Sequence, residues 1–178
     1  EIFISKSDAI TVYKAIKNNG REFNLCDVGL HAVNSLRLEK GYRHWGHDIA
    51  AEDNLFEAGL SFTAKPDGID FIGKDAFLKQ ATRTPKRKLI QFKLNDPDPM
   101  LYHNEPIIMN GEVNSYITSG MYGHSLGCAV GMGYVNCENL TEKKLRQIDF
   151  EIEIATERFS AEASLVSLYD SNGSKMKL

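Results

Sequence analysis

The chain has 178 residues, 42% of them hydrophobic, and its 21 basic and 24 acidic residues give a formal net charge of −3. This length fits one large domain or two small ones, and the charge balance excludes the basic surface of a nucleic-acid-binding protein. No apolar run reaches the roughly 18 to 20 residues that cross a bilayer, and the first residues do not resemble a signal peptide. We therefore expect neither a nucleic-acid partner nor a membrane association.

The first third of the chain predicts one strand and two helices. Residues 1–4 are typical of a strand already under way, so we expect the chain to be the C-terminal piece of a larger protein. Residues 7–19 and 30–40 each show apolar residues at helical spacing, and a glycine follows each segment. In the second helix, one face carries three apolar residues: Leu30, Val33 and Leu36.

A polar connection separates this part from the rest. Residues 60–64 alternate and predict a strand, and residues 74–81 predict a short helix. The segment 81–86 is polar and contains a proline, which indicates a domain boundary. We therefore predict two domains, residues 1–84 and residues 85–178.

Beyond residue 87 the chain changes to short strands punctuated by turns. The predicted strands lie at 88–94, at 107–113 with a hairpin turn at Asn110 and Gly111, and at 116–118, 129–135, 150–154 and 161–166. Residues 171–174 are expected to fray. The fold class is therefore α+β, a partial α/β domain followed by a small antiparallel β-barrel or jelly-roll-like module.

Several residue types that suggest chemistry have a simpler explanation here. Glycines between 120 and 133 match no nucleotide-binding fingerprint, and strand bends and turns account for them. The basic cluster 86–88 is typical of a solvated edge or linker. Three cysteines at wide spacing form no metal motif and no obvious disulfide set: Cys26, Cys128 and Cys137. Reduced cysteines favour the cytoplasm, or the mitochondrial matrix in a eukaryote.

Cys128 lies in an apolar strand, which favours a small core residue over an activated thiolate. His44 and His47 have a spacing that suits one metal ion, but the further ligands that a zinc site needs are missing, so we expect no metal site.

The segment 37–48 concentrates cations, carboxylates, two aromatic residues and two histidines just past the second helix. A surface helix does not need that mixture, whereas a site for a flat, polar, anionic ligand does. Tyr42 and Trp45 offer flat faces, Arg37 offers a cation for carboxylates, and Glu57 further on offers an acceptor for ring N–H groups. The alternative is a helix end with a surface ion pair between Arg37 and Glu39, in which the aromatic residues are packing anchors.

Three motifs carry a resemblance to a known family: the runs 39–45, 56–60 and 118–125. They resemble the folate-binding region of the glycine-cleavage T-protein (aminomethyltransferase) superfamily, and within it the C-terminal region of the sarcosine and dimethylglycine dehydrogenases. Val33 stands where T-proteins usually carry an arginine that holds folate, which favours the dehydrogenase branch. The resemblance implies that residues 1–84 are the C-terminal part of a folate-binding domain, followed by a C-terminal barrel domain.

The resemblance also implies a ligand and a function. Tetrahydrofolate would be bound by a set of five residues: Arg37, Tyr42, Trp45, Glu57 and Tyr122. The partners would be folate and an N-methyl amine, and a flavin (FAD) domain and the catalytic aspartate would lie upstream of Glu1. The chain would then be part of a flavin-dependent oxidoreductase that passes a one-carbon unit to folate, and the fragment itself would be inactive. A truncated glycine-cleavage aminomethyltransferase and a non-catalytic module of the same fold are the alternatives.

Overall fold

The computed structural model describes residues 1–177. The chain divides into two compact units, residues 1–33 and residues 34–178. No helix in the described part is both long enough and apolar enough to cross a membrane. The functional division into residues 1–84 and 85–178 stays a prediction.

The first unit is helical. It contains η1 (Lys6–Asp8), α1 (Ala9–Asn19), η2 (Arg21–Phe23) and the start of α2 (Leu30–Glu39). The predicted strand at residues 1–4 is wrong, because no described residue pairs with that segment and a strand needs a neighbour for its backbone hydrogen bonds. The α1 helix matches the prediction, but none of its residues is buried.

The buried face of α2 differs from the predicted one. Ser35, Leu38 and Glu39 are its buried residues. The three residues of the predicted apolar face are 77%, 47% and 57% exposed: Leu30, Val33 and Leu36. The Ser35 hydroxyl donates to the main-chain oxygen of Tyr122 at 2.7 Å, and Leu38 packs in a buried cluster with barrel residues. Contacts with the barrel, and not the count of apolar residues, therefore decide which face is covered.

The connection between α2 and the barrel contains η3 (Ser61–Thr63) and α3 (Lys74–Ala81). The α3 helix was predicted, but the strand expected at residues 60–64 is wrong. Local bonds such as Thr63 N–H to Leu60 O at 3.0 Å form one 3₁₀ turn there in place of pairing with a strand. Phe77 of α3 stacks on Phe56, with ring centroids 4.9 Å apart, and so holds the helix against the connection.

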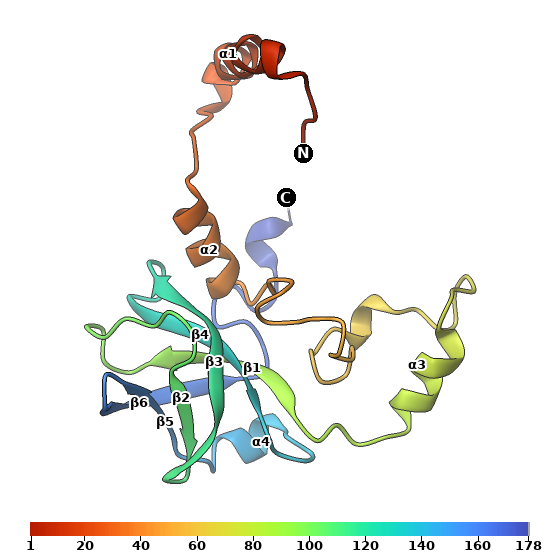
Figure 1. Ribbon diagram of the computed structural model, residues 1–178, viewed down its shortest axis with the longest axis vertical. Coiled ribbons are helices and arrows are strands. Elements are labelled where there is room, and N and C mark those ends of the chain that lie inside the picture. Colours follow the sequence, from red (N-terminus) through yellow and green to blue (C-terminus); the bar gives the residue numbers. More distant parts are fainter. Residues whose placement is uncertain (178) are drawn as a thin grey trace. The chain divides into compact units, whose positions relative to one another are not determined.

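The second half of the chain forms a closed antiparallel barrel, as the fold class predicted (Figure 1). Its strands among the described residues are β1 (Lys88–Leu94), β2 (Pro106–Met109), β3 (Glu112–Gly123), β4 (Cys128–Val135), β5 (Phe150–Ile154) and β6 (Glu157–Ser164), in the order β1-β4-β3-β2-β5-β6. Pairing of β6 with β1 closes the barrel. A short helix, α4 (Glu142–Leu145), precedes β5 and was not predicted, and η4 (Ser174–Met176) lies near the C-terminus.

The hairpin between β2 and β3 has the predicted turn. Asn110 and Gly111 have φ values of 52° and 87°, and a type I′ turn requires positive φ at both positions. The β3 strand is longer than predicted, since it runs through the segment that seemed to contain two separate strands. Pairing with both β2 and β4 explains its length.

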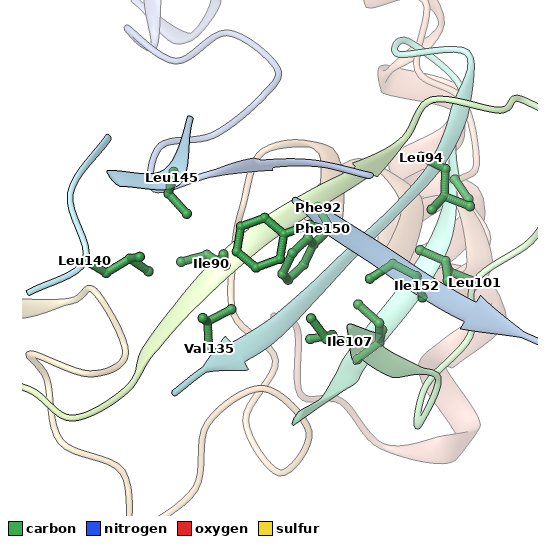
Figure 2. Packing of buried hydrophobic residues seen from close by; sticks show 12 residues of the cluster. Ile90, Phe92, Leu94, Leu101, Ile107, Val135, Leu140, Leu145, Phe150 and Ile152 are labelled. Atoms are coloured by element: carbon green, nitrogen blue, oxygen red, sulfur yellow. The ribbon is translucent and has the colours of Figure 1, made fainter. Parts of the chain in front are cut away.

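The barrel interior is the main hydrophobic core. Phe92 and Phe150 meet edge to face, with ring centroids 5.5 Å apart, and Figure 2 shows them at the centre of the cluster. Leu140 and Leu145 lie toward one side of this pair and Leu101 toward the other (Figure 2). Full burial of such side chains is worth about 1.5–3 kcal/mol each, so the barrel carries most of the stability of this unit.

The cysteine and glycine predictions for this region agree with the packing. Cys128 is buried, and burial raises the pKa of its thiol, as expected of a core cysteine. A Cβ at Gly120 would lie 2.6 Å from Leu101, and a Cβ at Gly133 would lie 2.5 Å from Ile107 Cδ1. These glycines therefore permit close approach of chain segments inside the barrel.

Candidate functional site

Asp48 organises the loop that follows α2. Its side chain is fully buried. Its Oδ2 accepts hydrogen bonds from Arg37 Nη1 at 2.6 Å and from the His44 main-chain N–H at 2.8 Å, and its Oδ1 accepts from Thr118 Oγ1 at 2.6 Å. One carboxylate thus joins α2, the loop and strand β3. Sequence reasoning did not single out Asp48, and the only signal was an acidic residue among several cations.

Glu39 makes a second buried link between α2 and the barrel. Only 1% of the residue is exposed. Its carboxylate accepts from the Ser125 N–H at 2.6 Å, the Ser125 hydroxyl at 2.9 Å and the Leu126 N–H at 3.1 Å. The alternative interpretation, with a surface ion pair between Arg37 and Glu39, is therefore wrong on this point, because residues two apart on a helix do not face each other.

Arg87 ties the loop 53–57 to the barrel. Its Nη2 lies 2.7 Å from Asp53 Oδ1, its Nε lies 3.1 Å from Glu57 Oε2, and its guanidinium stacks 4.3 Å from the centroid of the Tyr134 ring. Burial, and then the charge of Asp53, raise the pKa of Tyr134. The expectation that 86–88 is a solvated edge is thus wrong for Arg87. Sequence spacing gave no sign of this cluster, since Arg87 lies 30 and 34 residues from Glu57 and Asp53.

The five predicted folate contacts do not lie in one cluster. Arg37 is 14% exposed at its side chain and is engaged by Asp48, and Glu57 is engaged by Arg87. Trp45 is 67% exposed. Tyr122 on β3 meets His124 edge to face, with ring centroids 5.2 Å apart. Tyr42 lines a groove, and Glu57 borders a separate, smaller pocket of about 200 Å³.

This groove, which we call the Tyr42 groove, has a volume of about 870 Å³. Its lining combines Tyr42, Lys40, Arg43, Phe62, Val166 and Lys177 with other residues of the loop and the C-terminal segment. Pockets of about 300–1,000 Å³ with mostly apolar walls and a few polar groups are typical of small-molecule sites. The Tyr42 groove is therefore the candidate binding site.

The C-terminal segment forms one wall of the Tyr42 groove and is held in place by Asp170. Lys40 Nζ lies 2.8 Å from Asp170 Oδ2, and Asp170 Oδ1 accepts from the Ser174 N–H at 2.8 Å. The Lys40 ammonium, followed by the Ser174 hydroxyl, lowers the pKa of Asp170 to about 2. The fraying expected at residues 171–174 is replaced by a hydrogen-bonded turn.

The two histidines of the loop lie together, with ring centroids of His44 and His47 4.6 Å apart. Within residues 1–177, no three or more His, Cys, Asp or Glu side chains are grouped so that they could hold a metal ion. The Tyr42 groove, and not the histidine pair, is therefore the candidate site.

The fold is similar to that of a solved aminomethyltransferase. The aminomethyltransferase T of Bartonella henselae superposes with a TM-score of 0.70 at 24% identity, covering 85% of this chain and 42% of that chain. The GCVT N-terminal domain family matches residues 1–68, and the glycine cleavage T-protein C-terminal barrel domain family matches residues 87–170. The chain therefore belongs to the glycine-cleavage T-protein superfamily.

Curated relatives include amine-oxidising enzymes. The chain is 37% identical to the 4-methylaminobutanoate oxidase (formaldehyde-forming) of Paenarthrobacter nicotinovorans and 30% identical to the mitochondrial sarcosine dehydrogenase of Homo sapiens. Each alignment covers 99% of this chain but only 21% and 20% of the relative. The chain thus spans about a fifth of the length of these relatives.

Proposed function

We propose that the chain is the C-terminal folate-domain portion of a flavin-dependent oxidoreductase of the sarcosine and dimethylglycine dehydrogenase type. It binds tetrahydrofolate, which accepts a one-carbon unit from an N-methyl amine. The observation that carries this proposal is the similarity to 4-methylaminobutanoate oxidase along 99% of the chain. The Tyr42 groove supports it, since its size and mixed lining suit a ligand with an aromatic part and an anionic part.

The residues of the groove fit folate in chemical type. Tyr42 and Phe62 offer aromatic surface for a planar ring, and Arg43 and Lys177 offer cations for carboxylates. When bound, tetrahydrofolate supplies the nucleophilic nitrogens that take up the one-carbon unit. The role of this chain is to bind and orient that ligand, while flavin and the amine would be handled by other parts of a longer protein.

A second candidate is a truncated aminomethyltransferase of the glycine-cleavage type, which the fold of the Bartonella henselae protein favours. The sequence that precedes Glu1 in a longer protein separates the two candidates. A G-x-G-x-x-G fingerprint at the start of a long upstream domain supports the flavin enzyme, and a short upstream segment without it supports the aminomethyltransferase.

Calorimetric titration with tetrahydrofolate tests the proposal, with Tyr42→Ala compared against Tyr13→Ala. The two tyrosines are matched in exposure, at 49% and 51%, but Tyr13 donates its hydroxyl hydrogen to Asp27 in the first unit. Loss of a stacked ring costs about 0.5–1.5 kcal/mol, so Tyr42→Ala should weaken binding several-fold, whereas Tyr13→Ala should leave the affinity unchanged.

Both variants are first checked for folding by circular dichroism. Unchanged affinity in a folded Tyr42→Ala variant would show that Tyr42 is a packing residue. If tetrahydrofolate gives no heat of binding when it is titrated into the unaltered chain, the result would favour the third alternative, a non-catalytic module of the same fold.

A further inference from the structure

The Tyr42 groove has a one-sided charge. Lys40, Arg43 and Lys177 line it, and among the described residues no Asp or Glu does. Arg37 and Arg87 elsewhere in this region differ, since both bind carboxylates of the chain itself. The groove therefore favours an anion over a cation.

Arg43 supplies a cation that lacks a direct carboxylate partner in the described part of the chain. Its Nε donates to Ala58 O at 3.1 Å, its Nη1 to Gly41 O at 2.7 Å, and its Nη2 to Gly59 O at 3.5 Å. Carbonyl oxygens orient a guanidinium but do not neutralise its charge. Burial lowers the pKa of Arg43, and the nearby charge of Asp48 offsets only part of that shift.

Lys177 and Lys40 play different parts in the groove. Lys40 is engaged by the Asp170 carboxylate at 2.8 Å and so holds the wall in place. Lys177 is exposed and makes no ion pair with any described residue. It also lies beyond residue 170, where the match to the barrel family ends, in the C-terminal segment that lines the groove.

Apolar side chains complete the lining. Leu60, Phe62 and Val166 border the groove together with Tyr42. An aromatic ring fits against such walls, and its carboxylate would meet the cations. A pterin ring is less suited, because it carries several N–H donors, and among the described lining residues Asn172 is the one side-chain amide acceptor and no carboxylate is present.

We propose that the Tyr42 groove receives the benzoylglutamate end of folate and not its pterin, with Arg43 and Lys177 positioned for the carboxylates. This inference rests on the proposed function, and it names the half of the ligand that this chain holds. It also moves the anion contact from Arg37, which Asp48 occupies, to Arg43 of the run 39–45 and to Lys177, which lies outside the three motifs.

The test uses p-aminobenzoyl-L-glutamate as a probe for the tail and 6-methyltetrahydropterin as a probe for the ring, each titrated by NMR into the 178-residue chain. The tail probe should bind, and the pterin probe should not displace it. Lys177→Ala should raise the Kd of the tail probe about threefold and Lys177→Glu about tenfold, as for a partly exposed ion pair. Raising the salt from about 0.05 M to about 0.5 M should weaken this binding, since it screens the charges.

Lys143→Glu is the matched control, because Lys143 is an exposed lysine of α4 that does not line the groove. It should leave the Kd of the tail probe unchanged. Arg43→Met, if folded by its thermal transition, should weaken the tail probe further; if it is unfolded, the Lys177 variants decide. Displacement of the tail probe by the pterin, equal affinity in Lys177→Glu and the unaltered chain, or no binding of the tail probe would overturn the inference.

A titration with intact tetrahydrofolate separates this inference from the proposed function. Tetrahydrofolate binding that Lys177→Glu does not change would overturn the placement of the tail and leave the folate proposal standing. No tetrahydrofolate binding in the unaltered chain would count against the folate proposal itself, and with it the inference.

Discussion

At the scale of single residues, buried carboxylates rather than apolar side chains link α2 and its loop to the barrel. Asp48 and Glu39 each accept three hydrogen bonds, and between them they contact the loop, strand β3 and the turn that follows it. Buried carboxylates are tolerated only when their oxygens are well satisfied. Both residues meet that condition, so they fix the position of the loop that carries Tyr42.

Asp48→Asn tests this role. The change leaves the Arg37 guanidinium buried without its carboxylate, and breaking a buried pair in this way costs about 3–5 kcal/mol of the free energy of unfolding. The control is Glu162→Gln, which removes an exposed pair with Lys93 on the same barrel and should cost less than about 1 kcal/mol. Urea denaturation followed by circular dichroism measures both, and equal losses would show that Asp48 is not an organising residue.

At the scale of elements, the barrel depends on close approach of segments at glycines. The β4 strand is buried at every position from Cys128 to Val135, and Gly133 pairs with residues on both neighbouring strands. A Cβ at Gly133 would lie 2.5 Å from Ile107 Cδ1 and 2.7 Å from Tyr116 O. Space, and not backbone conformation, therefore requires glycine at this position.

Gly133→Ala should destabilise the chain by about 1–3 kcal/mol, as overpacking of a core does. Ile107→Val removes the Cδ1 atom and should cost about 0.5–1.5 kcal/mol by itself. The double variant should be more stable than the sum of the two changes predicts, because the smaller side chain relieves part of the clash. Strict additivity in thermal or urea unfolding would show that Ile107 is not the side chain that excludes a larger residue.

At the scale of the whole molecule, the barrel and the segment before it belong to one compact unit from residue 34 onward. Thr118 and Ser125 donate hydrogen bonds to Asp48 and Glu39, and the Gln91 side chain donates to Leu38 O. The predicted functional boundary near residue 85 is therefore crossed by several buried contacts.

Truncated segments of the chain measure how much these contacts contribute to the free energy of unfolding. A segment of residues 34–178 should unfold at the same urea concentration as the whole chain. A segment of residues 87–178 should still give a mostly β circular-dichroism spectrum, but it should be less stable by about 3–6 kcal/mol, because at least six hydrogen bonds to residues 35–48, worth about 0.5–1 kcal/mol each, are lost. Equal free energies of unfolding for the two segments would show that residues 34–86 do not stabilise the barrel.

The local features of this protein could be predicted from its sequence. Helical spacing predicted α1, α2 and α3 nearly to the residue, and the Asn110 and Gly111 pair predicted its hairpin turn, because these features depend on neighbours a few positions away. The predicted strands at 1–4 and 60–64 are wrong, because an extended segment becomes a strand only when a distant segment pairs with it. The five predicted folate contacts stay a prediction, and Tyr42 is the one among them that lines the candidate groove.

The sequence by itself determined the family, the barrel and the loop that carries the site, since these rest on motifs and on local periodicity. Only the tertiary structure decided which face of α2 is buried, that Arg37 binds Asp48 and Glu57 binds Arg87, and that Arg43 and Lys177 line the groove with Tyr42. The physical reason is that a charged side chain takes its partner from whatever the fold brings within about 4 Å, and nothing in the order of residues along the chain specifies that distance.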